Sequence, residues 1–225
     1  MTEHPDDPRD PARALTPKSA RRRWWRLLLP PAPDVLALLV AQGEVSVRGL
    51  DAFEAWSHGG GPQAAAAVRS AQHAAYRTRR ELLEALQAAL STPVDQEDLY
   101  VLSERLDRIL NEARNTVREG EILGWTPSAH AARMAERLAA GTRALLAGFA
   151  LLSKDPENAG RQADAASDAV HHVERDYREA MAELLQVDDL RAVLAAQDLY
   201  RRYLHVAEAI IAVADRLWYV VLRAA

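Results

Sequence analysis

The sequence predicts an all-α protein, an elongated six-helix bundle built from two three-helix repeats. Apolar residues make up 49% of the 225 residues, aromatic residues only 6% and alanine about a fifth, a balance that favours long, closely packed helices. Leucine, alanine and valine recur at steps of three and four residues over long segments, which is the helical period. Four isolated prolines divide these segments at positions typical of helix starts.

Each expected helix has a start signal or a run of apolar periodicity. Pro62 follows three glycines, whereas Pro93, Pro127 and Pro156 each follow a threonine or aspartate whose oxygen can cap a helix. The expected helices span residues near 34–57, 62–90, 93–119, 127–153, 156–186 and 189–223. At 1.5 Å per residue they are roughly 35 to 50 Å long, too long for crossover helices of an ordinary α/β sheet.

Residues 1–33 are expected to form a flexible, proline- and arginine-rich arm, and residues 34–225 the bundle domain. The arm holds seven of the eleven prolines, and it cannot bury enough apolar surface to offset chain entropy. Prolines interrupt its apolar stretch, so we do not expect an export signal. Two interpretations stay open for its basic, aromatic run: docking on anionic lipid or an acidic partner, or folding back onto the bundle. The run comprises Arg21, Arg22, Arg23, Trp24, Trp25 and Arg26.

The last expected helix carries two adjacent apolar stripes, one through Val206, Ile210 and Val213, the other through Ala207, Ile211 and Ala214. Such a wide apolar face indicates a helix that is either central in the bundle or half exposed to a partner. No apolar stretch approaches the roughly 20 residues that a membrane-spanning helix needs. We expect a cytoplasmic protein. The basic and aromatic residues of the arm also leave open a peripheral contact with the inner face of the membrane.

Composition and motifs disfavour several classes of function. A net charge of −4 gives no general attraction for nucleic acid, and the absence of cysteine excludes disulfides, zinc-thiolate centres and thiol nucleophiles. No phosphate-binding loop, nucleophile elbow or zincin helix is present. Gly59–Gly61 lacks the lysine and serine of a phosphate cradle and indicates a loop. We therefore expect a protein that is not an enzyme.

Two further patterns in the sequence are an internal repeat and a segment that resembles a known family. The tripeptide Asp98-Leu99-Tyr100 recurs one hundred residues later as Asp198-Leu199-Tyr200, which suggests an internal repeat. The segment Ser91–Tyr100, with Thr92-Pro93 and Glu97-Asp98-Leu99-Tyr100, resembles the signature of the PhoU-like phosphate-transport regulators. The subgroup is the one associated with low-affinity inorganic phosphate transporters, and the likeness spans roughly 34–223. The resemblance implies the two-repeat bundle, a regulatory role, and an inorganic phosphate transporter or related regulatory protein as partner. Formation of a homo-oligomer is left open by the sequence.

The resemblance also implies metal sites, because the family holds iron or other metal clusters on acidic pairs one helical turn apart. At the matching positions this chain has Gln72 and Tyr76 on one helix, and Asp107, Arg108 and Asn111 on the next. Only Asp107 is a candidate ligand there, since an arginine among cation ligands is unfavourable. The first-half cluster is therefore expected to be lost.

In the second half, two His-x-x-Glu pairs remain, His171 with Glu174 and His205 with Glu208. If their helices are antiparallel, Glu174 lies level with His205. The geometry then allows one transition-metal ion to be bound by both nitrogen and oxygen ligands. The other interpretation is a solvated polar face, and we expect little or no bound metal. Three functions stay open: a non-enzymatic regulator of phosphate transport, a metal-binding bundle, or an interaction module unrelated to phosphate.

Overall fold

The computed structural model describes residues 34–224, which form helices joined by short connections, with no strand among them. The helices are α2 (Val35–Ser57), α3 (Gly61–Ala88), α4 (Gln96–Leu123), α5 (Ala129–Leu151), α6 (Pro156–His171), α7 (Val173–Leu184) and α8 (Leu190–Ala224). The predicted all-α bundle is confirmed. The predictions for the arm, including its Arg and Trp run at residues 21–26, concern residues outside the described range.

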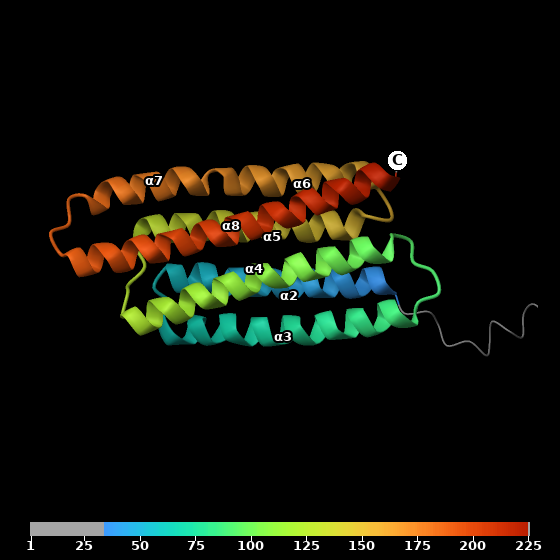
Figure 1. Ribbon diagram of the computed structural model, residues 1–225, viewed down its shortest axis with the longest axis horizontal. Helices are drawn as coiled ribbons and strands as arrows, with labels where there is room; N and C mark the ends of the chain where they lie inside the picture. Colours follow the sequence, from blue (N-terminus) through green and yellow to red (C-terminus); the bar gives the residue numbers. More distant parts are fainter. Residues whose placement is uncertain (1–33, 225) are drawn as a thin grey trace, which may run out of the picture. The chain divides into compact units, whose positions relative to one another are not determined.

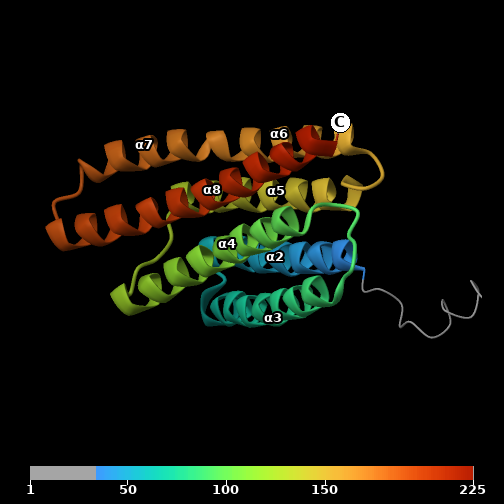
Figure 2. The same cartoon turned by 45° about the vertical axis from the view of Figure 1, so that its right-hand side comes forward.

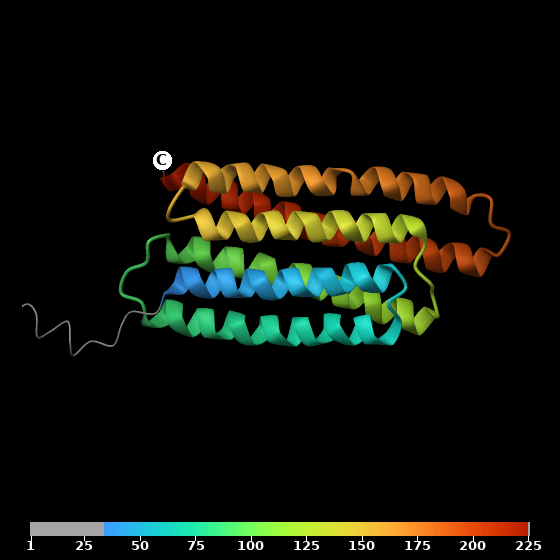
Figure 3. The same ribbon diagram turned by 180° about the vertical axis from the view of Figure 1, so that it is seen from behind.

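The helices pack in two layers. Figure 3 shows a row in which α3, α2, α5 and the α6–α7 pair lie side by side, and Figures 1 and 2 show α4 and α8 crossing in front of this row. In the front layer, α4 packs against α2, α3 and α8, and α8 packs against α4, α5, α6 and α7. The core therefore lies between α2, α4, α5 and α8.

The helix starts agree only in part with the proline signals. Pro156 begins α6, and the backbone N–H of Asn158 donates to Oδ1 of Asp155 at 3.1 Å, as a proline after a capping residue predicts. The expected starts at Pro93 and Pro127 are wrong. Asp95 and Ser128 provide the caps instead, because their side chains accept the first free backbone N–H groups of α4 and α5 (2.9 and 3.3 Å).

The fifth expected helix is divided into α6 and α7 at His172. This residue has a ψ of −14°, well short of the helical value of about −42°, and the regular hydrogen-bond ladder is interrupted there. Both parts still pack against α5 and α8. The expectation of one continuous helix over 156–186 is therefore corrected to two helices that form one bent rod.

The last helix, α8, is central. Val206, Ile210, Val213 and Leu217 are all fully buried, which decides between the two positions that the sequence left open. The exposed apolar residues of α8 lie near its two ends. None of the helices within 34–224 combines the length and hydrophobicity that crossing a bilayer requires.

The recurring tripeptides do not occupy equivalent surroundings. Asp98 is buried while Asp198 is exposed, and Tyr100 is exposed while Tyr200 is buried. Only the leucine between them is buried in both copies. The shared letters therefore do not mark matching sites, and the two-repeat relation stays a prediction.

Helices α2 and α4 approach closely through small and paired polar residues. A methyl group on Gly49 would lie only 2.2 Å from Cδ2 of Leu110, so the glycine allows this contact. Nearby, Gln42 and Ser103 are fully buried and exchange two hydrogen bonds, from Gln42 Nε2 to the Ser103 carbonyl (2.9 Å) and from Ser103 Oγ to Gln42 Oε1 (2.7 Å). Both polar side chains are thereby satisfied inside the bundle.

Candidate functional site

A polar ladder joins α3 to α4 at the positions where the resemblance places acidic metal ligands. Gln72 Nε2 donates to Asn111 Oδ1 at 3.0 Å, and Asn111 Nδ2 donates to Asp107 Oδ2 at 2.9 Å. Arg79 Nη1 lies 3.7 Å from the same carboxylate oxygen. One carboxylate, two amides and an arginine do not fit a cluster of hard cations. In the structure these side chains form hydrogen bonds with one another.

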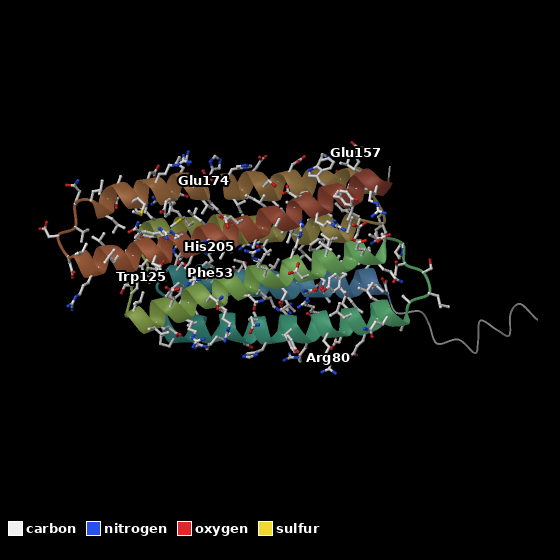
Figure 4. The ribbon with its side chains drawn as sticks, in the orientation of Figure 1. Phe53, Arg80, Trp125, Glu157, Glu174 and His205 are labelled. Atoms are coloured by element: carbon white, nitrogen blue, oxygen red, sulfur yellow. The ribbon has the colours of Figure 1, made fainter. Side chains whose placement is uncertain are left out.

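The four residues of the second candidate metal site are not gathered into one cluster in the described part of the chain. His171 and Glu208 are exposed, and Glu174 accepts a hydrogen bond from Arg178 Nη2 at 2.6 Å. Figure 4 shows Glu174 and His205 at similar positions along α7 and α8, as expected. In residues 34–224, however, no three His, Asp or Glu side chains gather closely enough to hold a metal ion. The metal content stays a prediction, which elemental analysis of protein purified without chelator checks.

The candidate ligands of the two halves do not share one interior. Gln72, Asp107 and Asn111 lie between α3 and α4, whereas Glu174 and Glu208 are exposed on the other half. Among the described helices, α3 packs only against α2 and α4. The prediction of a common centre is wrong because the core helices separate α3 from α7.

Sequence reasoning missed an ion triad between α4 and α8, in which two arginines meet one buried carboxylate. Asp98 is 1% exposed, and its Oδ1 and Oδ2 lie 2.5 Å from Arg216 Nη2 and 3.1 Å from Arg223 Nη1. Both guanidinium groups also lie over the ring of Tyr219, at 4.7 and 5.7 Å from its centroid. The triad fixes the C-terminal end of α8 to the start of α4.

A group of polar and ionic contacts joins α5 to α7. The Asp176 carboxylate is nearly fully buried and accepts a hydrogen bond from Arg137 Nε at 2.5 Å. One turn further along, Arg133 Nη2 lies 3.5 Å from Glu179, and His130 Nε2 lies 2.8 Å from Glu183. These three contacts hold α7, and with it the α7–α8 turn, against the bundle.

Aromatic side chains fill the bundle near this turn. Phe53 and Trp56 of α2 pack with Tyr203 and Trp125, with ring centroids 5.0 to 6.1 Å apart. Trp125 also meets Tyr200 edge to face at 5.8 Å. In Figure 4, Trp125 lies at the end of the bundle and Phe53 further inside. The aromatic cluster packs beneath this end of the bundle.

Above this base, apolar side chains are exposed. Of the eleven large apolar side chains that are exposed in the described part of the chain, six lie at the end of α4 or around the α7–α8 turn. Figures 1 and 2 place these two segments at the same end of the bundle, where the α7–α8 turn projects furthest. We call these six residues the apolar end surface: Ile122, Leu123, Leu185, Val187, Leu190 and Leu194.

The apolar end surface borders a groove formed by two adjoining hollows of about 430 and 400 Å³, both lined by Leu123. The first lies between α4 and α8 and is also lined by Arg118 and Ile122. The second lies between the α4–α5 connection and the α7–α8 turn and is also lined by Trp125 and Val187. We call the two hollows together the α4–α8 groove.

No protein-family model matches this chain, and no curated protein matches it either. The resemblance to the PhoU-like regulators therefore depends on the segment around Thr92–Tyr100 and on the helix pattern. The chemistry of the described residues and this resemblance together support the proposals below.

Proposed function

We propose that this protein is a non-enzymatic accessory or regulatory protein of inorganic phosphate transport that acts by binding another protein. The observation that carries the binding part is the apolar end surface. Ile122 is 73% exposed, Leu185 83% and Leu190 69%, although each of them could contribute to stability if it were buried. Exposed apolar groups that gather in one place are typical of interaction sites.

The fold suits such a role, because paired and packed side chains anchor the elements next to the apolar end surface. The α5–α7 contacts hold α7 against α5, and the aromatic cluster packs beside the α4–α5 connection. Elements that are already held in place lose less conformational entropy when a partner binds. Covering one exposed leucine contributes roughly 1 to 2 kcal/mol, and a few central contacts of this size supply most of the affinity of a typical interface. The mechanism is steric or conformational, with helix faces packing against the partner.

The phosphate part of the proposal comes from the resemblance of Ser91–Tyr100 to the PhoU-like signature. It identifies the expected partner as an inorganic phosphate transporter, contacted on its cytoplasmic side, or a related regulatory protein. The metal-binding alternative gains no support from the positions of His171, Glu174, His205 and Glu208.

The test is affinity capture from native membranes with the tagged full-length chain. The variant Leu190→Asp changes the apolar end surface, and Leu222→Asp is the matched control, because Leu222 is equally exposed (69%) at the opposite end of α8. We expect a phosphate transporter to co-purify with the wild type and the control but not with Leu190→Asp. A chain lacking residues 1–33 shows whether the arm contributes.

The outcomes separate the two parts of the proposal. Capture of an unrelated protein, lost in Leu190→Asp, supports binding and contradicts the phosphate role, leaving an interaction module outside phosphate physiology. Equal capture by both leucine variants contradicts the use of the apolar end surface. Phosphate uptake by cells that lack the protein, compared with complemented cells, provides the functional readout.

A further inference from the structure

We infer that α7 is a hinged segment whose ionic docking on α5 controls the apolar end surface. This inference rests on the proposed function, since it adds a means of regulation to the same surface. It depends on four features of α7: the breaks at its two ends, the carboxylate on its inward face, its partners on α5 and its place beside the apolar end surface.

The two ends of α7 are breaks in the run of helices. His172, with its ψ of −14°, separates α7 from α6, and the turn at residues 185–189 separates it from α8. His172 and Leu185 are both exposed, so a change of backbone angle at either residue displaces little packed surface. Figure 3 shows the α6–α7 pair at the outer edge of the row of helices. The breaks therefore allow α7 to move as a unit while the long helices stay in place.

The inward face of α7 has a carboxylate at its centre. Val173, Asp176 and Ala180 are the buried residues of this helix, so the acid lies between the two buried apolar side chains. Three further apolar side chains of α7 are partly covered: Tyr177, Met181 and Leu184. A carboxylate that is buried without partners is strongly unfavourable, because it has lost its hydration. Docking of α7 therefore depends on the groups that compensate the charge of Asp176.

These groups lie on one face of α5. His130, Arg133 and Arg137 follow one another at steps of three and four residues, and they meet three acids at the same steps on α7. The contacts are Arg137 with Asp176 (2.5 Å), Arg133 with Glu179 (3.5 Å) and His130 with Glu183 (2.8 Å). Two other charged groups lie close by: Glu136 contacts His58 at 2.9 Å, and Arg175 lies 3.9 Å from Glu179.

The inner pair contributes most to docking. The side chains of Asp176 and Arg137 are 2% and 27% exposed, whereas Glu179 and Glu183 are exposed to solvent. Exposed ion pairs contribute little to stability. Removal of the Arg137 guanidinium leaves Asp176 with Arg133 alone, whose Nε atom is 3.6 Å away. The released position of α7 is then favoured, because water hydrates the carboxylate there.

Release of α7 alters the apolar end surface, because this helix leads directly into it. Leu184, the last residue of α7, lines the second hollow of the α4–α8 groove together with Val187. Leu185 follows it in the chain and belongs to the apolar end surface. When α7 is released, these side chains lose their position beside Leu123. The apparent affinity for a partner then falls with the fraction of molecules in which α7 is docked, and a bound partner in turn favours docking.

Hydrogen–deuterium exchange of the full-length protein tests the hinge without any partner. Arg137→Gln should speed the exchange of protected backbone amides in α7 by about tenfold or more, while those of α6 and of the middle of α8 keep their rates. Amides at the start of α8, such as that of Val193, should speed up together with α7, which reports the change in the apolar end surface.

Two further variants control this experiment. Arg143→Gln is the matched control, since Arg143 lies on the same helix but pairs with Asp51 and Glu54 of α2. It should leave exchange in α7 unchanged. Asp176→Ala combined with Arg137→Met replaces the inner pair by apolar groups and should restore slow exchange in α7, because no carboxylate is then buried.

Several results overturn the inference. One is equal exchange in α7 of Arg137→Gln and Arg143→Gln; another is an equal acceleration in every helix, which shows global destabilisation. Fast exchange of α7 in the Asp176→Ala, Arg137→Met variant would show that the buried charge is not the cause. Unchanged exchange at Val193 would show that α7 opens without altering the apolar end surface.

The membrane capture described above adds an independent readout. Arg137→Gln should capture less of the partner than Arg143→Gln does, and equal capture by the two variants contradicts the regulation. If the exchange results hold while the wild type captures no transporter, only the phosphate role fails.

Discussion

The triad around the buried Asp98 carboxylate offers the sharpest test of the structure, through the single change Asp98→Asn. Asparagine keeps the size of the side chain and one carbonyl oxygen but removes the negative charge. Arg216 then loses its charged partner inside the bundle, where its Nε atom already has no hydrogen-bond acceptor. The change acts on the contact that joins α4 to the end of α8.

The expected cost follows from the exposure of the three groups. Breaking a fully buried ion pair by removing one partner costs about 3 to 5 kcal/mol. Asp98 is 1% exposed, but the side chains of Arg216 and Arg223 are 17% and 49% exposed, so both can regain water. We therefore expect Asp98→Asn to lower the free energy of unfolding by about 2 to 3 kcal/mol, below the full range.

Urea unfolding followed by circular dichroism measures this difference in the free energy of unfolding. A double-mutant cycle, which compares Asp98→Asn, Arg216→Gln and the two changes combined, isolates the coupling between the two residues. Glu174→Gln provides the control, since the Glu174–Arg178 pair is short (2.6 Å) but 66% and 73% exposed. We expect the control to change stability by less than about 0.5 kcal/mol. A loss in Asp98→Asn no larger than that of the control would refute the role assigned to the triad.

Three other predictions concern packing and ionisation. Gly49→Ala should lower the free energy of unfolding by about 1 to 3 kcal/mol, because the new methyl group meets the buried side chain of Leu110. Urea unfolding measures this loss. An unchanged urea midpoint would contradict the close contact between α2 and α4. Tyr203→Phe should cost about 1 kcal/mol, because Ser57 Oγ loses the buried hydrogen bond of 2.8 Å to the tyrosine hydroxyl. Burial raises the pKa of Tyr203 above the ordinary tyrosine value of about 10. Above about pH 10, the tyrosine ionises in the unfolded chain but not in the folded protein. The contribution of Tyr203 to stability is therefore complete below about pH 10 and falls as the pH rises further. Urea midpoints between about pH 8 and pH 11 should show this alkaline decline in the wild type and a smaller one in Tyr203→Phe.

The class of fold could be predicted because it depends on local signals. The three- and four-residue apolar period of α8 selects one face, and that face is the one that the structure buries through Val206, Ile210 and Val213. Helix starts were less predictable, because several neighbouring residues can cap. Asp95 and Ser128 compete with Thr92 and Thr126, and the choice depends on how the connection packs.

The candidate site could not be read from the sequence for a different reason. Asp98 looks like an ordinary acidic residue in the first turn of a helix, where it also suits the helix dipole. Its partner Arg216 lies more than a hundred residues away, so only the packing of α4 on α8 reveals the pair. Likewise, Leu185 and Val187 flank a turn without a helical period, and nothing local distinguishes an exposed leucine from a buried one there.

The roles that the structure gives to the PhoU-like segment bear on the phosphate proposal. Asp95 caps α4, Asp98 holds two arginines of α8, and Leu99 is buried in the core. Each of these residues therefore has a folding reason to be present, whatever the protein binds. The positions where the resemblance implies metal ligands are occupied by the hydrogen-bonded side chains of Gln72, Asn111 and Asp107, so the likeness of the segment does not extend to a ligand set. The likeness of this segment to the PhoU-like signature therefore argues for a similar architecture more strongly than for a similar partner. For this reason, membrane capture and phosphate uptake decide the function, rather than further comparison of the segment.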